Sequence, residues 1–176
     1  MPHPTEAVLS LGSNQGDRLA WLNRAVTALS AWPGIRLLES SPVYETDPVD
    51  APPAFAGHRY LNQVVIVATT LAAEAFSEAV HAVEGQLGRT RGAVPNLPRN
   101  IDIDIIAWGA LRSGSPALTL PHPRARERRF VLQPLADLRP GFVLPGETLT
   151  VSDLLRALPE APRVARFPGC PVDRDP

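Results

Sequence analysis

Two aspartates in an otherwise apolar stretch are the residues best suited to chemistry in this chain. Asp102 and Asp104 alternate with isoleucines in the sequence PRNIDIDII, residues 98–106. Because side chains alternate across a strand, both carboxylates would share one face, about 7 Å apart. Like charges at that distance repel unless a cation lies between them or one carboxylate binds a proton. The spacing favours a cation site, and the simpler alternative is an amphipathic strand with a wet face.

Arginines surround this aspartate pair in the sequence. All seventeen basic side chains of the chain are arginine, and eight of them lie between residues 89 and 129. Guanidinium groups bind phosphate oxygens through paired hydrogen bonds, and carboxylates bind Mg²⁺. Phosphoryl transfer from a nucleotide requires both kinds of group, so the pattern points to that reaction. Because the chain has no lysine, Schiff-base chemistry, a lysine base and a P-loop lysine are excluded.

Other catalytic classes find little support in the sequence. It has no Gly-x-Ser-x-Gly motif, and its four histidines lack the spacing of zinc ligands. His122 alone has a distinctive setting, since prolines flank it and the arginine run follows it. We therefore expect neither serine hydrolysis nor a zinc site. His122 is a candidate site residue, and a histidine in a surface turn is the alternative.

The composition is that of one ordinary globular domain. The chain has 176 residues and a net charge of −1, which argues against a nucleic-acid binder. Its single cysteine, Cys170, permits no internal disulfide or cysteine metal cluster, which fits a reducing cytoplasm. The N-terminus has no signal-peptide pattern, and no apolar run reaches the roughly 18 residues that span a bilayer. We expect a cytoplasmic protein that binds neither nucleic acid nor membrane.

Hydrophobic periodicity indicates the elements that position these residues. The expected elements are a strand over residues 7–11, a helix from Asp17 to Pro33, strands over 35–44 and 60–70, a helix over 72–87 and the strand that carries the aspartates. This β-α-β-β-α-β order predicts an α+β fold. It is typical of a ferredoxin-like sandwich, with two helices on one face of an antiparallel sheet.

Residues after Gly109 form an extension of that unit. They comprise a hairpin-like segment, the basic run 124–129, an apolar piece over 130–138 and a short helix near 151–158. We expect residues 1–158 to form a single domain, with C-terminal extension included, and residues 159–176 to be a loosely ordered proline-rich tail. Two long loops, over 46–59 and 89–100, adjoin strands with candidate site residues. Loops of this length often bind ligands.

Six motifs follow one another along the chain. They are LGSN at 11–14, SPVYETDPV at 41–49, YLN at 60–62, GR at 88–89, PRNIDIDI at 98–105, and PHPR at 121–124 with RRFVL at 128–132. In this order they resemble the 6-hydroxymethyl-7,8-dihydropterin pyrophosphokinase family of folate biosynthesis, from residue 8 to about residue 158. The resemblance implies transfer of the β,γ-diphosphate of ATP, as one unit, to the pterin hydroxymethyl oxygen, with release of AMP.

The resemblance also implies a site for ATP and metal. The paired aspartates of the family, here Asp102 and Asp104, hold two Mg²⁺ ions that bridge the triphosphate and orient the attacking hydroxyl. These ions would offset the repulsion between the two carboxylates. The residues expected to contact the phosphates or the nucleoside are Arg89, Arg99, Ile105, Thr119, His122 and Arg128, with Arg89 and Arg99 also catalytic.

By the same resemblance, the pterin would lie between the rings of Tyr60 and Phe130, with Asn62 hydrogen-bonded to its edge. A flat heterocycle packs well between aromatic faces, and an amide can both donate and accept. Packing in the core is the alternative for both rings. The backbone that completes this pocket would come from Thr46, Pro48 and Val49. The expected partners are these two small molecules, and the expected state is a monomer.

The sequence departs from the family pattern in two loops. Before its Pro-Arg pair the family usually has a basic residue, any residue and then Gly or Ala, and many members have tryptophan at the middle position. Here the three residues are Pro95, Asn96 and Leu97. A glycine that is common after the Pro-Val of the second motif is Asp50. These departures predict altered loop closure and kinetics, not a different reaction.

Two other functions stay open. One is a ferredoxin-like module that binds nucleotide or RNA without catalysis, although the third strand has no aromatic RNA-binding run. The other is a Mg²⁺-dependent phosphoryl transferase of the cyclase type that uses the same aspartates. The product separates these possibilities, because a cyclase-type enzyme would form a cyclised nucleotide or ADP in place of AMP and a pyrophosphorylated pterin.

Overall fold

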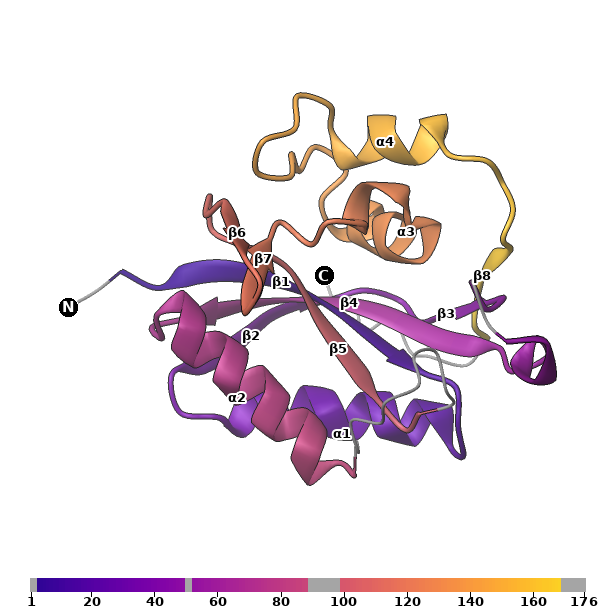
Figure 1. Cartoon of the computed structure of the whole chain (residues 1–176), viewed down its shortest axis with the longest axis horizontal. Coiled ribbons are helices and arrows are strands. Elements are labelled where there is room, and N and C mark those ends of the chain that lie inside the picture. The colour runs from indigo at the N-terminus through magenta and orange to yellow at the C-terminus, as the bar shows by residue number, and fades with distance from the viewer. Residues whose placement is uncertain (1–2, 50–51, 89–98, 169–176) are drawn as a thin grey trace, which may run out of the picture.

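A six-stranded antiparallel sheet runs through the part of the chain that the computed structural model describes, residues 3–49, 52–88 and 99–168 (Figure 1). Its order is β5-β1-β4-β3-β8, and β2 also pairs with β4. The strands are β1 (Thr5–Ser13), β2 (Ile35–Ser40), β3 (Tyr44–Thr46), β4 (Tyr60–Thr69), β5 (Asp102–Trp108) and β8 (Val164–Arg166). β1 and β4 therefore lie at the centre, with the aspartate strand β5 beside β1.

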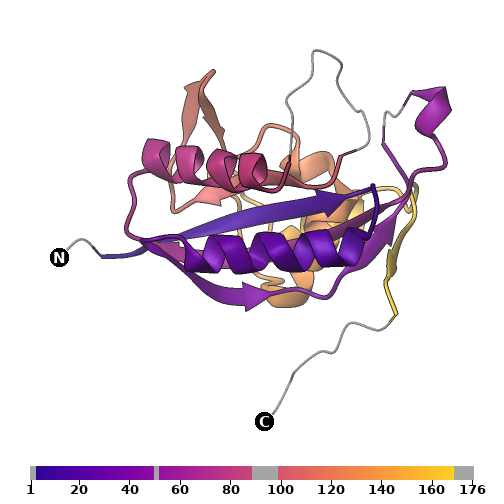
Figure 2. The same ribbon diagram turned by 90° about the horizontal axis from the view of Figure 1, so that it is seen from below.

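Helices cover both faces of this sheet (Figures 1 and 2). On one face lie α1 (Arg18–Ala31) and α2 (Ala73–Gln86), and on the other lie α3 (Arg129–Leu138) and α4 (Val151–Ala157). The shorter elements are the 3-10 helices Pro53–Phe55 and Ala125–Glu127 and the hairpin of β6 (Ser113–Ser115) and β7 (Leu118–Leu120). No helix within the described ranges is long and apolar enough to cross a membrane.

The predicted ferredoxin-like order is confirmed by β1, α1, β2, β4, α2 and β5, with α1 and α2 on one face. The extension after Gly109 adds a second helical layer, α3 and α4, on the opposite face. The apolar piece over 130–138 thus becomes helix α3. The aspartate strand consequently lies between two packed layers, and one of them comes from outside the βαββαβ unit.

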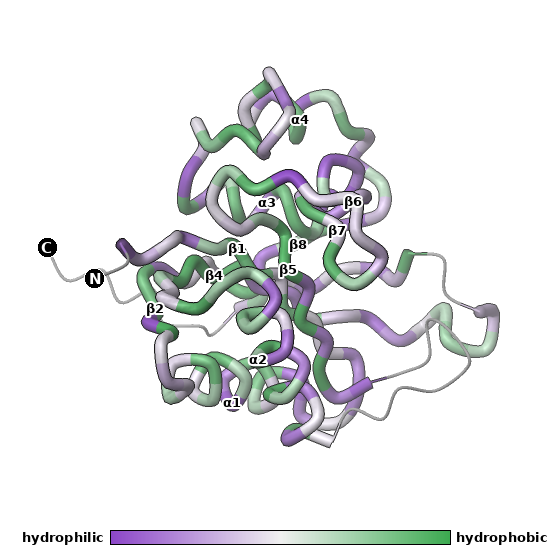
Figure 3. The backbone as a smooth tube through the Cα atoms, turned by 60° about the vertical axis from the view of Figure 1, so that its left-hand side comes forward, coloured by the Kyte–Doolittle hydropathy of each residue, from purple (hydrophilic) through white to green (hydrophobic). Residues whose placement is uncertain are grey.

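Each face of the sheet has its own apolar core because strand residues alternate. Leu9 and Leu11 of β1 face α1 and α2 and belong to one buried cluster with Phe76. Val8, the residue before Leu9, points to the opposite face and belongs to a second cluster with Leu132 of α3. Burying one such side chain contributes about 1.5–3 kcal/mol. Figure 3 accordingly shows hydrophobic residues, in green, along much of the sheet and the facing helices.

Local signals set the ends of helix α1. The helix begins after Asp17, as predicted, and the Asp17 carboxylate accepts the backbone N–H of Ala20 at 3.0 Å. It ends at Ala31, before the Pro33-Gly34 turn, where Gly34 has a φ of 83°. That left-handed conformation suits glycine and turns the chain into β2.

The prediction of one strand over residues 35–44 is wrong, because the chain leaves regular pairing at Ser41. β2 ends at Ser40 and β3 begins at Tyr44. The Ser41 hydroxyl accepts the backbone N–H of Val64 at 3.0 Å, so a side chain takes the place of a backbone acceptor there. Pro42, which follows, has no N–H to donate. The break gives a separate strand β3 beside the start of β4.

The expectation of loose order over residues 159–176 is wrong for Val164–Arg166, which form β8. β8 pairs with β3, with Thr46 opposite Val164 and Tyr44 opposite Arg166. The outer edge of β3 would otherwise expose unpaired backbone groups, and β8 satisfies them. Cys170 lies outside the described residues.

Candidate active site

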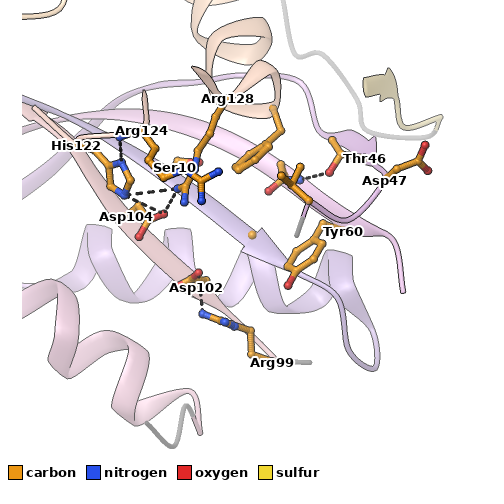
Figure 4. Close-up of a pocket in the computed structure, with 14 residues that line it drawn as sticks. Ser10, Thr46, Asp47, Tyr60, Arg99, Asp102, Asp104, His122, Arg124 and Arg128 are labelled. Carbon is orange, nitrogen blue, oxygen red and sulfur yellow. Dashed lines mark hydrogen bonds and ion pairs between the residues drawn. The ribbon is translucent and has the colours of Figure 1, made fainter. Parts of the chain in front are cut away.

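A cavity of about 260 Å³ opens on the α3 side of the sheet (Figure 4). One end, which we call the charged half, is lined by Arg99, Asp102, Asp104, His122, Arg124 and Arg128. The other end, the neutral half, is lined by Thr46, Val49, Tyr60, Asn62 and Phe130. The remaining lining residues are Ser10, Gly12 and Asp47. The cavity thus joins the middle of the sheet to the start of α3.

Strand β5 presents both aspartates to this cavity. Asp102 lies opposite Gly12 of β1, and Asp104 lies opposite Ser10. Ile101 and Ile103 point to the other face and are 0% and 4% exposed in the core under α1 and α2. The prediction that the carboxylates share one face is therefore confirmed. Their neighbours on β1 are small, which leaves room above the sheet.

Two arginines bind the two carboxylates separately. Arg99 donates from Nη1 to Asp102 at 3.0 Å, and Arg128 donates from Nη1 to Asp104 at 3.1 Å (Figure 4). Burial raises the pKa of Asp104, the charge of Asp102 raises it further, and His122 and Arg128 oppose the rise only in part. A cation bound here would stabilise the ionised form of Asp104, so the charged half favours cation binding.

His122 is held as a neutral donor beside Asp104. Its Nδ1 accepts the backbone N–H of Arg124 at 3.1 Å, so the proton of the neutral ring is assigned to Nε2. Nε2 lies 3.9 Å from Asp104 Oδ2 and 3.5 Å from Arg128 Nη1. Burial lowers the pKa of His122 despite the nearby carboxylate of Asp104. The ring can therefore donate one hydrogen bond to an anion in the cavity.

Asn62 is fixed in the neutral half by a side chain of β3. Its Nδ2 donates to Thr46 Oγ1 at 2.6 Å, and both residues are buried. Asn62 lies opposite Tyr44 of β3 on one side and opposite Gly12 of β1 on the other. The amide therefore has a defined orientation before any ligand binds.

Phe130 and Arg128 join the two halves at the start of α3. Phe130 lines the cavity and also packs against the core under α3, so the site and core interpretations of this ring both hold. The Arg128 guanidinium carbon lies 5.4 Å from the centre of the Phe130 ring, while its Nη1 binds Asp104. Tyr60 also lines the cavity, and burial raises the pKa of its hydroxyl.

The cavity brings together most of the residues that the sequence singled out. They are Thr46, Val49, Tyr60, Asn62, Arg99, Asp102, Asp104, His122, Arg128 and Phe130. Pro48, Ile105 and Thr119 are not among its lining residues: Ile105 packs against the opposite core, and the Thr119 hydroxyl donates to Ser115 within the hairpin. Their predicted ligand contacts stay predictions. Arg89, Pro95, Asn96, Leu97 and Asp50 lie outside the described residues.

Four lining residues were not predicted as site residues. Gly12, Asp47 and Arg124 lie inside motifs that were recognised, so their sequence context was a signal. Ser10 had a weaker signal, the small polar side chain between Leu9 and Leu11 in a buried strand. Strand alternation turns it away from those leucines and toward the face of Asp104.

The donor set fits Mg²⁺ when phosphate supplies further ligands. Among the described residues, no group of three or more His, Cys, Asp or Glu side chains could hold a metal by itself. Mg²⁺ is usually bound by one or two carboxylates together with substrate phosphates. Asp102 and Asp104 supply that number, and the repulsion between them favours a cation.

Comparisons with known proteins agree with this geometry. A family model described as 7,8-dihydro-6-hydroxymethylpterin-pyrophosphokinase matches residues 8–140. A Methylorubrum extorquens protein named 2-amino-4-hydroxy-6-hydroxymethyldihydropteridine pyrophosphokinase is 41% identical over 146 residues, 82% of this chain and 89% of that protein. A Bacillus subtilis protein of the same name is 38% identical over 132 residues, 75% of this chain and 77% of that protein.

The chain also matches one part of larger proteins. The folic acid synthesis protein fol1 of Schizosaccharomyces pombe is 35% identical over 156 residues, which are 87% of this chain but 20% of that protein. A solved structure of Plasmodium falciparum HPPK-DHPS superposes with a TM-score of 0.67 over 89% of this chain and 46% of that chain, at 14% identity. At that identity the likeness concerns the fold alone.

Proposed function

The chain belongs to the 7,8-dihydro-6-hydroxymethylpterin-pyrophosphokinase family, and from this membership we propose that the cavity is the place where its two substrates meet. The enzyme is a pyrophosphokinase of folate biosynthesis. It transfers the β,γ-diphosphate of ATP to the hydroxymethyl group of 6-hydroxymethyl-7,8-dihydropterin and releases AMP.

We assign the charged half to the triphosphate. Arg99 and Arg128 would exchange part of their bonds to Asp102 and Asp104 for phosphate oxygens, which bind guanidinium groups in paired contacts. His122 would donate its Nε2 proton to the same group. Arg89 is proposed as a further phosphate contact from the family pattern, and Ile105 and Thr119 as nucleoside contacts.

We propose that Asp102 and Asp104 hold two Mg²⁺ ions together with the triphosphate. When bound, Mg²⁺ neutralises phosphate charge and makes the β-phosphorus more susceptible to attack. The support from this chain is that Asp102 and Asp104 share one strand face, and that burial and, to a lesser extent, the charge of Asp102 raise the pKa of Asp104. A carboxylate pair that is costly alone becomes favourable when cations and phosphate fill the space above it.

We assign the neutral half to the pterin. Tyr60 and Phe130 supply aromatic surface, and Asn62 presents an oriented amide to the edge of the heterocycle. Thr46 orients that amide, and the backbone at Pro48 and Val49 is proposed to complete the pocket. With the pterin in this half, its hydroxymethyl group would point across β1 toward the aspartates.

The transfer itself needs alignment more than covalent help from the protein. The hydroxymethyl oxygen forms a bond to the β-phosphorus and loses its proton to solvent. The bond from that phosphorus to the oxygen bridging the α-phosphorus breaks, and AMP leaves with the electron pair. Arg99 and Arg128 would stabilise the charge that spreads over the phosphate oxygens. We also propose that the protein acts as a monomer and that its partners are these two small molecules.

The single observation that carries this assignment is a row across the sheet in which Asn62, Gly12 and Asp102 lie side by side. It gives the heterocycle contact and the metal contact a fixed separation on rigid strands. An arrangement of this kind suits transfer between two bound substrates.

The test is separation of nucleotides after incubating the protein with ATP, Mg²⁺ and 6-hydroxymethyl-7,8-dihydropterin. AMP should form only when pterin and Mg²⁺ are both present, so reactions without pterin or with EDTA are the controls. ADP or a cyclised nucleotide would instead identify another phosphoryl transferase. Absence of AMP at high enzyme concentration, with ATP still bound, would favour a nucleotide-binding module without activity.

A further inference from the structure

Gly12 occupies the middle of the row that joins the two halves of the cavity. It lies on β1 directly between Asn62 of β4 and Asp102 of β5, and it is buried. Neighbouring strands lie about 4.8 Å apart, so the amide and the carboxylate are separated by about 10 Å of sheet with no side chain between them.

The backbone at Gly12 does not itself require glycine. Gly12 is a regular residue of β1, and it is not among the glycines with positive φ. An L residue could therefore adopt the same conformation. Glycine at this position is therefore explained by the space that a side chain would fill, not by the backbone conformation.

A side chain at position 12 would meet the neutral half of the cavity. A Cβ built on Gly12 would lie 2.9 Å from Asn62 Oδ1, closer than real Cβ contacts, and 3.7 Å from Tyr60 Cδ1. No atom of Asp102 comes within 4 Å of that position. A methyl group would therefore disturb the Asn62 amide and leave the carboxylate on the other side untouched.

The Asn62 amide has little freedom to move away. Its Nδ2 donates to Thr46 Oγ1 at 2.6 Å, which directs Oδ1 toward β1 and Gly12. Rotation of the amide to relieve the contact would break this hydrogen bond. Among the described residues no side chain donates to Oδ1, so this oxygen is an available acceptor at the wall of the cavity.

We propose that Gly12 is a positioning residue for the pterin: its missing side chain keeps Asn62 Oδ1 where an N–H on the edge of the heterocycle can donate to it. The inference rests on the proposed function, because it takes Asn62 as the contact for the heterocycle. Pterin selectivity then depends on the absence of a side chain at position 12. Gly12 acts through Asn62, and nucleotide binding does not depend on it.

The test compares Gly12→Ala with wild type by calorimetry of each ligand alone. The probes are 6-hydroxymethyl-7,8-dihydropterin, and an ATP analogue with a methylene group between the α- and β-phosphorus together with Mg²⁺. The Kd for the pterin should rise about tenfold or more, as when one hydrogen bond of a buried acceptor is misplaced, while the Kd for the nucleotide stays unchanged. Gly114→Ala is the matched control, because Gly114 is also a strand residue and nothing lies within 4 Å of its Cβ position.

A double variant tests whether Gly12 acts through Asn62. In Asn62→Ala the atom that opposes a methyl group is gone, so adding Gly12→Ala should weaken pterin binding little further. If Gly12→Ala alone fails to fold, the double variant should fold, and its pterin Kd should match that of Asn62→Ala. Losses that multiply in the double variant would overturn the inference, and so would wild-type pterin affinity in Gly12→Ala.

The same experiment separates the inference from the proposed function. Wild type that binds the nucleotide but not the pterin would overturn the proposed function, and the role of Gly12 with it. Wild type that binds both, while Gly12→Ala binds the pterin equally well, would overturn the role of Gly12 alone. A fall in nucleotide affinity equal to that for the pterin would also reject it, since it would indicate a general structural effect.

Discussion

In the charged half of the cavity Arg99 and Arg128 hold Asp102 and Asp104 by ion pairs, whereas in the neutral half one hydrogen bond from Asn62 to Thr46 fixes the amide. The ion pairs are partly exposed, and a ligand can replace either partner. The amide is buried and fits against Gly12, so its position is set before a ligand arrives. Changes in the charged half should therefore appear mainly in turnover, and changes in the neutral half mainly in pterin affinity.

The largest effect should follow from removing one negative charge of the charged half. We expect Asp102→Asn or Asp104→Asn to lower the rate of AMP release about a thousandfold or more, because metal and phosphate charges lose their partner. Calorimetry should show unchanged pterin affinity. Asp17→Asn is the matched control, since asparagine caps a helix as well as aspartate. Wild-type turnover at saturating Mg²⁺ would refute the metal assignment.

A smaller effect, on both the charged half and the neutral half, should follow from changing Arg128. Its guanidinium binds Asp104 and lies over the Phe130 ring, so Arg128→Ala removes a contact from each half. We expect kcat/KM to fall about a hundredfold and the affinity for both substrates to decrease. Arg128→Lys should recover only part, because an ammonium lacks the planar fork.

The control for Arg128 is Arg36→Ala, which removes an exposed arginine of β2. Steady-state kinetics with each substrate varied in turn provides the measurement. A loss confined to one substrate would show that Arg128 belongs to one half and that the division between the halves is complete.

Asn62→Ala should affect only the neutral half. We expect pterin affinity to fall about tenfold or more, since the oriented amide is lost, and nucleotide affinity to stay as in wild type. Calorimetry with each ligand measures this directly. Asn23→Ala, on the exposed face of α1, is the control. Equal losses for the two ligands would contradict the separation of the halves.

The smallest effect concerns a hydrogen bond of Tyr44, a residue of strand β3 next to the neutral half. The Tyr44 hydroxyl donates to Asp137 of α3, and Tyr44 lies opposite Asn62 in the sheet. Burial and the Asp137 carboxylate raise the pKa of Tyr44 from 10.0 to about 12. The protonated hydroxyl therefore contributes stability that is complete below pH 10.0 and is lost as the pH rises through about 12.

We expect Tyr44→Phe to lower the free energy of unfolding by about 1 kcal/mol at neutral pH, the contribution of one hydrogen bond. The difference from wild type should shrink above pH 10.0, where the tyrosine begins to ionise. Urea unfolding at neutral and alkaline pH measures the difference. The chain has two tyrosines, so absorbance titration of Tyr60→Phe follows Tyr44 alone. A difference that does not change with pH would contradict this account.

Local patterns were enough to predict much of the fold and the charged half. The helices over α1 and α2 follow from apolar spacing and end signals, and the shared face of Asp102 and Asp104 follows from strand alternation. Motifs then indicated Tyr60 and Asn62, which line the cavity. The helices and the shared face depend on residues that are close in sequence, whereas Tyr60 and Asn62 depend on the order of six short motifs along the chain.

What sequence reasoning missed depends on pairing between distant segments. The place of Gly12 between Asn62 and Asp102 requires the register of three strands, which no single stretch encodes. Glu84 was not noticed either, although it is 2% exposed and accepts the backbone N–H of Ile103 at 2.7 Å, which ties α2 to the aspartate strand. A buried carboxylate of this kind is recognised only when its partner is known.

The pairing of β8 with β3 also bears on self-association of the protein. A free sheet edge offers unpaired N–H and C=O groups on which a strand of another molecule can pair, and this is a common start of aggregation. β8 occupies that edge of β3, the strand that carries Thr46. Without residues 164–166, the wall of the neutral half would become an open template, and loss of solubility would accompany loss of the proposed pterin site.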